Sequence, residues 1–296
     1  MAQGFGIAPP GYRLPETTRL GRVRLQVADL ARSLAYYERV LGLRVIRRAD
    51  ARAELGTSDG RTVVVELREL TGASPVPHHG RLGLYHYAIL LPDRSSLGAF
   101  IAHLAAIGVR AGMSDHLVSE AIYLTDPDGL GIEVYADRPR SGWHHEGRQL
   151  VMATEPLDVV NVIAAAGGRA WAGMPPGTGL GHVHLFVSDL IAAEKFYHAG
   201  LGFDKVVWSY PGALFLSAGG YHHHLGINTW AKQAEKAGEH DARLLDWEVV
   251  LPAPTDITAA AASLAAQGAA VQWNAGGATI ADPWRTNVRL TAAAAS

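Results

Sequence analysis

Histidine is the residue type with the most chemistry to offer in this chain, which has 14 histidines and no cysteine. Imidazole is the commonest metal ligand among side chains, and it titrates near neutral pH. The absence of thiols excludes disulfides, thiolate zinc sites, iron–sulfur ligation and cysteine nucleophiles. The residue types therefore favour a metal site with nitrogen and oxygen ligands, provided that the histidines are brought together.

Four apolar, strand-like segments carry the histidines of interest. Side chains alternate along a strand, so His182 and His184 share one face. A strand through the run of three histidines would place His222 and His224 on one face and His223 on the other. A single histidine on an apolar strand is more often a hydrogen-bonded core residue than a ligand, so only several that fall together indicate a site. The segments are Leu84-Tyr85-His86-Tyr87-Ala88, Asp115-His116 through Tyr123-Leu124, Gly181-His182-Val183-His184-Leu185 and Tyr221-His222-His223-His224-Leu225.

An internal repeat organises these segments. Residues 22–30 and 182–190 share the pattern of an apolar strand ending in Asp-Leu, at an offset of 160 residues. Leu84-Tyr85-His86 and Leu244-Leu245-Asp246 begin a second pair of strands at the same offset. Two halves of the chain are therefore predicted to fold as the same unit.

Each half contains a finer repeat of one strand, one amphipathic helix and about three further strands. Asp29 and Asp189 stand where helix N-caps belong, and Gly42 and Gly202 where the chain leaves the helix. The apolar face of the first helix is predicted to comprise Leu30, Leu34, Tyr37 and Leu41. We expect an α+β fold of four βαβββ modules that form two cup-shaped half-barrels. The predicted boundaries are 1–137 for modules one and two, 138–178 for a linker with a short helix, and 179–296 for modules three and four.

The helix pattern, the histidine segments and the turn Thr125-Asp126-Pro127-Asp128-Gly129 followed by Glu133 resemble the vicinal oxygen chelate superfamily. This superfamily contains glyoxalases, bleomycin-type resistance proteins and extradiol dioxygenases. The sequence is most similar to bacterial catechol-2,3-dioxygenase-like proteins, over nearly its whole length. The resemblance implies that metal ligands lie on the first and last strands of two modules that face each other.

Only one pairing of modules fills these ligand positions without a cation. Modules two and three offer His86, His182 and Glu133, with Gly226 in the fourth position. The other positions contain Arg22 and Glu66 in module one and Asp246 and Arg289 in module four. A guanidinium in such a position argues against a metal. We therefore expect modules two and three to pair around the metal and modules one and four to form a metal-free cup. Two histidines and one carboxylate suit Fe(II), or alternatively Mn(II).

The resemblance also implies groups for the chemistry. A histidine about forty residues after the metal histidine of module three acts as an acid or base in the family, and His224 fits this spacing, with His222 behind it. Tyr123, ten residues before Glu133, and His116 are expected to face the same cup. Taken alone, Tyr123 is as consistent with an aromatic core residue.

Three functions remain open at this point. The leading hypothesis is an extradiol ring-cleaving dioxygenase that acts on a small aromatic diol and O₂. A metal-dependent isomerase or transferase of the glyoxalase kind usually needs a fourth protein ligand, which Gly226 does not provide. The third possibility is a metal-free protein that binds an aromatic or antibiotic molecule. Such a protein has no need for His116, Tyr123 and His224 as proton-transfer groups around three metal ligands.

Composition argues against other partners. The formal net charge is −2 and the pI is about 6.7, so we expect no nucleic-acid partner. The sequence has no basic leader followed by an apolar stretch and no run of eighteen apolar residues, which predicts a cytoplasmic protein without a membrane partner. The family resemblance is compatible with a homo-oligomer.

Overall fold

The ends of the first helix in modules one and three are built from the residues that the repeat indicates. Asp29 accepts a hydrogen bond from the backbone N–H of Arg32, and Asp189 accepts hydrogen bonds from the first turn of its own helix. Gly42 and Gly202 follow these helices with φ of +71° and +98°, a conformation that favours glycine. The four residues of the predicted apolar stripe are buried: Leu30, Leu34, Tyr37 and Leu41.

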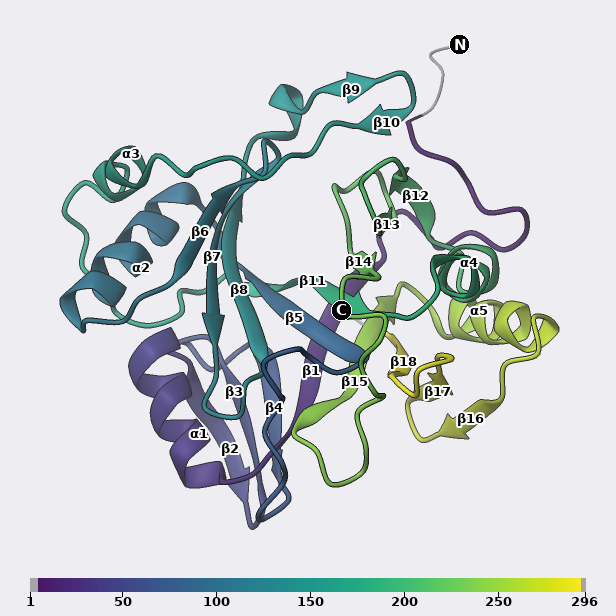
Figure 1. The fold of residues 1–296 in the computed structure, drawn as a ribbon, viewed down its shortest axis with the longest axis horizontal. Helices are drawn as coiled ribbons and strands as arrows, with labels where there is room; N and C mark the ends of the chain where they lie inside the picture. Colours follow the sequence, from purple (N-terminus) through teal and green to yellow (C-terminus); the bar gives the residue numbers. More distant parts are fainter. Residues whose placement is uncertain (1–4, 294–296) are drawn as a thin grey trace.

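The computed structural model describes residues 5–293. Its short helices flank two curved sheets, with α1 and α2 on one side of the molecule and α4 and α5 on the other (Figure 1). The helices are α1 (Leu30–Tyr36), α2 (Arg94–Ala106), α3 (Val159–Ala164), α4 (Leu190–Ala193) and α5 (Pro254–Ala266), and π-helical turns over Tyr37–Leu41 and Glu194–Gly200 continue α1 and α4.

The first sheet has eight strands contributed by modules one and four. The two modules meet where β1 pairs antiparallel with β15, and within each module the first and last strands are parallel neighbours. In spatial order the strands are β16 (Val271–Asn274), β17 (Gly277–Ala281), β18 (Asn287–Ala292), β15 (Arg243–Leu251), β1 (Arg19–Val27), β4 (Val63–Glu69), β3 (Arg52–Gly56) and β2 (Arg44–Ala49).

The second sheet repeats this arrangement with modules two and three. Here β5 pairs antiparallel with β11, so each sheet combines one module from each half of the chain. The α+β fold of βαβββ modules in two half-barrels is confirmed. In spatial order the strands are β12 (Asp204–Val207), β13 (Ala213–Ser217), β14 (Leu225–Asn228), β11 (Gly179–Phe186), β5 (Gly83–Leu90), β8 (Gly131–Asp137), β7 (Ser119–Thr125) and β6 (Gly112–Asp115).

The segment between the two halves of the chain is not a free linker. It contains a 3₁₀ turn over Arg140–Gly142, a small hairpin of β9 (His145–Glu146) and β10 (Gln149–Leu150), and α3. Its residues Met152–Thr154 line a cavity of the second sheet, as described below.

Buried tyrosine–aspartate pairs tie neighbouring modules together. Tyr37 Oη donates to Asp126 over 3.1 Å, and Tyr197 Oη donates to Asp282 over 2.8 Å. Each pair joins the first helix of one module to the Asp-Pro turn of the next. Burial raises the pKa of both aspartates to about 6.

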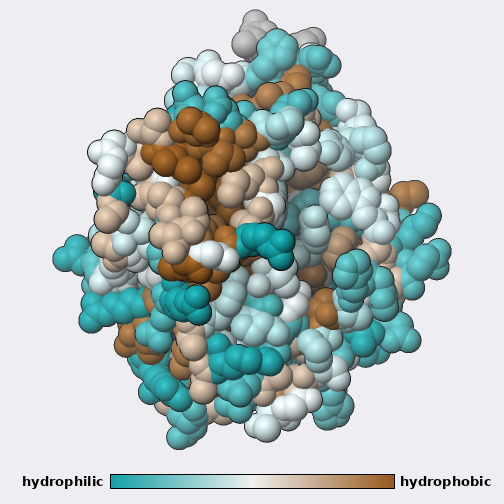
Figure 2. Space-filling model, turned by 60° about the vertical axis from the view of Figure 1, so that its left-hand side comes forward, coloured by the Kyte–Doolittle hydropathy of each residue, from teal (hydrophilic) through white to brown (hydrophobic). Residues whose placement is uncertain are grey.

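The surface is mostly hydrophilic on the face shown in Figure 2, with an apolar area over α3, where Val160 is 80% exposed. No helix within residues 5–293 is long and apolar enough to cross a membrane.

An ion-pair cluster fills the centre of the first sheet. Arg24 is 6% exposed, and its guanidinium lies 2.8 Å from both Glu66 and Asp246 and 3.3 Å from Glu248. Burial alone would raise the pKa of Glu66, but hydrogen bonds from Arg68 and Arg24 hold it below its usual value. Because three carboxylates converge on Arg24, they depend on its charge.

We expect Arg24→Met to destabilise the fold by about 3 kcal/mol, since it removes the cation that three carboxylates share and leaves the largely buried Asp246 without an ion pair to the described residues. The midpoint of urea unfolding, followed by circular dichroism, measures this loss. Arg61→Met is the matched control, because the Arg61 side chain is 87% exposed and its one ion pair within residues 5–293 is a 3.9 Å contact with Asp59. Equal midpoints for the two variants would contradict a supporting role for Arg24.

Candidate metal centre

Three adjacent strands of the second sheet bring two histidines and a glutamate together. In the strand register Ala88 of β5 lies opposite Glu133 of β8 on one side and His182 of β11 on the other. Paired residues project from the same face of a sheet, and so does His86, which is two residues from Ala88. The small Ala88 side chain leaves the space above it to its three larger neighbours.

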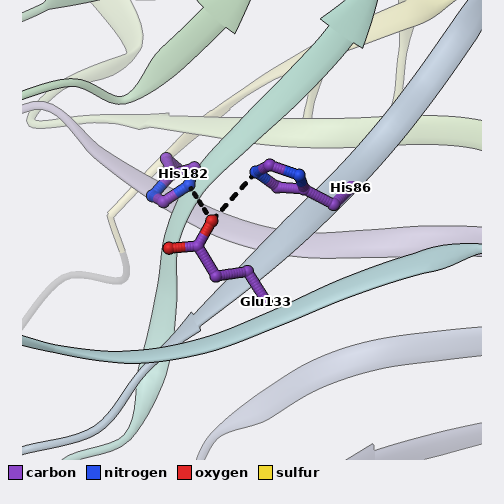
Figure 3. A group of neighbouring side chains, drawn as sticks. All are labelled: His86, Glu133 and His182. Atoms are coloured by element: carbon purple, nitrogen blue, oxygen red, sulfur yellow. Dashed lines mark hydrogen bonds and ion pairs between the residues drawn. The ribbon is translucent and has the colours of Figure 1, made fainter. Parts of the chain in front are cut away.

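The polar atoms of these side chains converge on one point. Glu133 Oε2 lies 3.0 Å from His86 Nε2 and 3.1 Å from His182 Nε2, as shown in Figure 3. One potential ligand atom from each residue lies within 4.8 Å of the other two, and all three residues are buried. Within the described part of the chain this is the only group of histidine and acidic side chains with such spacing.

The site fits a divalent metal ion. Ligand atoms about 2.1 Å from a metal and at right angles to one another lie about 3.0 Å apart, which matches the separations of Glu133 from the two histidines. His86 Nε2 is buried and makes no well-directed hydrogen bond to the described residues, so it is available as a ligand atom. Two imidazoles and a carboxylate, without a fourth protein ligand, leave coordination positions open.

The protonation states also suit metal binding. Burial alone would raise the pKa of Glu133, but the interactions with His182 and His86 outweigh it and hold the pKa well below its usual value. Burial lowers the pKa of His182 to about 4, although Glu133 acts in the opposite direction. An ionised carboxylate and a neutral imidazole are the forms that bind metals.

The three side chains open onto a cavity of about 320 Å³. Its far wall is aromatic, with Tyr210, Phe215 and Trp230, and residues 152–154 of the connecting segment cover one side. His116, Tyr123, His184 and His223 supply further polar groups of the lining. The cavity thus has the size and polarity of a site for a small aromatic molecule.

Tyr123 and His116 form a hydrogen-bonded pair in this lining. Tyr123 on β7 lies opposite Glu133 in the register, and its Oη is 2.5 Å from Nε2 of His116. His116 Nδ1 lies 2.7 Å from the carbonyl oxygen of Ala153, which only accepts, so Nδ1 carries the proton. In the neutral ring Nε2 then accepts from Tyr123. Burial raises the pKa of Tyr123 well above its usual value, and the charge of Glu133 adds to this.

The run of three histidines differs from its expected placement. His224 does not line the cavity: its Nδ1 accepts from the backbone N–H of Ala218 over 3.2 Å, and its ring stacks on Phe203. Strand alternation does not apply here, because β14 begins only at Leu225.

The side chain that reaches the cavity is that of His223. Its ring centroid lies 4.1 Å from that of His182. His222 lies behind it, with Nδ1 2.7 Å from His223 Nδ1 and Nε2 2.9 Å from Asp137 Oδ1. The spacing from His182 points to this run but does not distinguish its members.

Gly226 has a packing role. A Cβ atom at this position would lie 2.8 Å from Cγ of His184, so the glycine makes room for the imidazole. His184 Nε2 lies 3.0 Å from the Asn228 side-chain amide, which donates to it. His184 is therefore a fixed wall residue, and its shared face with His182 is the sequence signal for this position.

Comparisons with known proteins agree with this geometry. The sequence matches the Glyoxalase/Bleomycin resistance protein/Dioxygenase superfamily over residues 19–134 and 179–284. The catechol-2,3-dioxygenase of Bacillus subtilis (strain 168) is 46% identical over 241 residues, which are 80% of this chain and 84% of that protein.

Solved structures share the fold at lower identity. A structure from Bacillus subtilis subsp. subtilis str. 168 has a TM-score of 0.65 and 12% identity, covering 96% of this chain and 87% of the other. Glyoxalase I from Zea mays has a TM-score of 0.54 and 18% identity, covering 93% and 92%. With both sheets matched in sequence and in structure, the chain belongs to the glyoxalase/bleomycin resistance protein/dioxygenase superfamily.

Proposed function

We propose that the protein is an extradiol dioxygenase that cleaves a catechol-type aromatic with O₂, and that it uses Fe(II), or alternatively Mn(II). The observation that carries the proposal is the buried His86–Glu133–His182 group at the base of an aromatic cavity. The relative of 46% identity, a catechol-2,3-dioxygenase, supports the same reaction. Because the described residues offer no fourth ligand, a glyoxalase-type centre is less well supported.

The metal would be held by His86, Glu133 and His182. When bound, it supplies a Lewis acid and a redox-active centre with open coordination positions. The protein contributes a pocket in which Phe215 and Trp230 pack against the aromatic ring of the substrate and orient it. A cavity of about 320 Å³ has room for a single ring and its substituents.

His223 is the residue best placed to take up a catechol proton. The Asp137 carboxylate only accepts, so His222 donates to it through Nε2. In neutral His222, Nδ1 must then accept, and His223 donates to it through its own Nδ1. This chain of contacts leaves Nε2 of His223 without a proton and able to receive one.

Tyr123 and His116 hold the other side of the pocket. The Tyr123 hydroxyl is neutral and donates to His116 Nε2, so its oxygen has lone pairs that can accept the hydrogen of a substrate hydroxyl. His116 is fixed in turn by the Ala153 carbonyl of the connecting segment. The pair therefore positions a substrate oxygen next to Glu133.

The metal-binding step predicts that protein purified without chelators contains about one iron or manganese ion per chain. His182→Ala should lose this ion, since it removes one of three ligands, whereas the exposed His144→Ala should keep it. Elemental analysis of both variants measures the difference. Wild-type protein that binds neither metal, even after anaerobic reconstitution, would contradict the proposed function.

The proton-transfer step predicts that His223→Gln lowers kcat for catechol cleavage about 100-fold or more, with the metal content unchanged. Glutamine keeps a polar side chain but cannot take up a proton. The measurement is formation of the yellow ring-fission product after anaerobic loading with Fe(II) and addition of catechol and O₂.

His224→Gln provides the comparison, because the two histidines are adjacent and both are buried. His224 contacts Ala218 and Phe203 rather than the cavity, so its replacement should lower stability more than kcat of the folded protein. If the folded, metal-loaded His224→Gln loses more activity than His223→Gln, the assignment of His223 is wrong.

A further inference from the structure

The first sheet contains a second cup, at the place that corresponds to the metal centre. Its cavity of about 210 Å³ is lined by residues of β1, β2, β3 and β4 and by Arg289 of β18. The positions that correspond to metal ligands hold Arg22 and Glu66 from module one and Asp246 and Arg289 from module four. Guanidinium groups therefore stand near the point where the other cup would hold a cation.

Two arginines of this cup, Arg22 and Arg24, are each engaged in several ion pairs. Arg24 contacts Glu66, Asp246 and Glu248, as described above. Arg22 lies 2.8 Å from Glu54, 3.6 Å from Glu66 and 3.4 Å from Glu248. The positive charges of these two arginines are therefore balanced by carboxylates of the protein and do not attract a ligand.

Three further arginines of the cup, Arg52, Arg68 and Arg289, differ from these two. Each has N–H groups that make no hydrogen bond to the described residues. The Arg52 side chain lines the cavity and makes no hydrogen bond or ion pair with any residue from 5 to 293. Arg68, which lies opposite it in the register, uses only Nε, in a 2.7 Å hydrogen bond to Glu66. Nε of Arg289 is buried without a hydrogen bond to the described residues and lies 3.8 Å from its nearest carboxylate, that of Glu248.

The charge count points the same way. Six arginines line the cavity, whereas the carboxylates that contact them inside the cup are those of four residues. Two positive charges are left, in a chain whose formal net charge is −2. The six are Arg22, Arg24, Arg47, Arg52, Arg68 and Arg289.

We infer that this second cup binds a small oxyanion with two negative charges, held by the free N–H groups of Arg52, Arg68 and Arg289. Guanidinium forks match the oxygen pairs of phosphate and carboxylate groups. The volume of about 210 Å³ admits inorganic phosphate or a short dicarboxylate but not an extended polyanion. This site is independent of the metal centre and of the proposed reaction.

Calorimetric titration of the metal-loaded protein with inorganic phosphate and, separately, with succinate tests the proposal. Sodium chloride at matched ionic strength corrects for screening. We expect at least one dianion to bind and to raise the unfolding temperature beyond the chloride control. Binding of phosphate alone would identify a tetrahedral ligand, and binding of succinate would identify a dicarboxylate.

Variants locate the site. Arg52→Gln should weaken dianion binding about tenfold, because it removes charge-assisted hydrogen bonds without disturbing an ion pair. Arg61→Gln, on the exposed turn between β3 and β4, should leave binding unchanged. Phosphate bound at the metal would survive Arg52→Gln, so an unaltered affinity in that variant would overturn the inference. Failure of both dianions to exceed the chloride control would also overturn it.

Discussion

The contact of one buried carboxylate with two imidazoles is the interaction on which the site depends. Glu133, His86 and His182 come from β8, β5 and β11, and the last of these strands lies in the opposite half of the chain. An ionised carboxylate is costly to bury unless it is paired. The pairing of β5 with β11 brings His182 to Glu133 as its second imidazole partner. The site therefore forms only when the two halves of the chain pack together.

The two sheets have the same arrangement of strands but carry different side chains in their cups. In the second sheet the equivalent positions hold two imidazoles and one carboxylate, and the cavity beside them is lined by aromatic side chains. In the first sheet Arg22 takes the place of His182, Asp246 that of His86 and Arg289 that of Glu133. The carboxylates there are neutralised by the protein's own arginines. Repetition of the module therefore gives one cup suited to a metal and an aromatic substrate, and another that is held by ion pairs and open to anions.

Much of the fold follows from local patterns. The 160-residue repeat, the caps at Asp29 and Asp189 and the stripe from Leu30 to Leu41 are each short-range signals, and the structure contains all of them. The grouping of His86, Glu133 and His182 follows from their positions on repeated strands, because register is conserved between modules that fold alike.

The placement of the remaining site residues depends on contacts that no local pattern contains. Strand alternation predicts that His224 faces the site, but residues 221–224 form a bend before β14 and the side-chain order changes there. His223 reaches the cavity because His222 is held by Asp137, 85 residues away in the chain. The cover supplied by Met152–Thr154 likewise comes from a segment without strong periodicity, and only its packing against His116 assigns it to the site.

We expect one metal ion to bind between the second and third modules. Diffraction data collected at and below the iron absorption edge, from crystals of iron-loaded protein, would locate this ion. The expected result is a single strong anomalous peak bounded by His86, Glu133 and His182. A peak in the arginine-lined cup of the first sheet, or no peak at the three ligands in iron-loaded crystals, would contradict it.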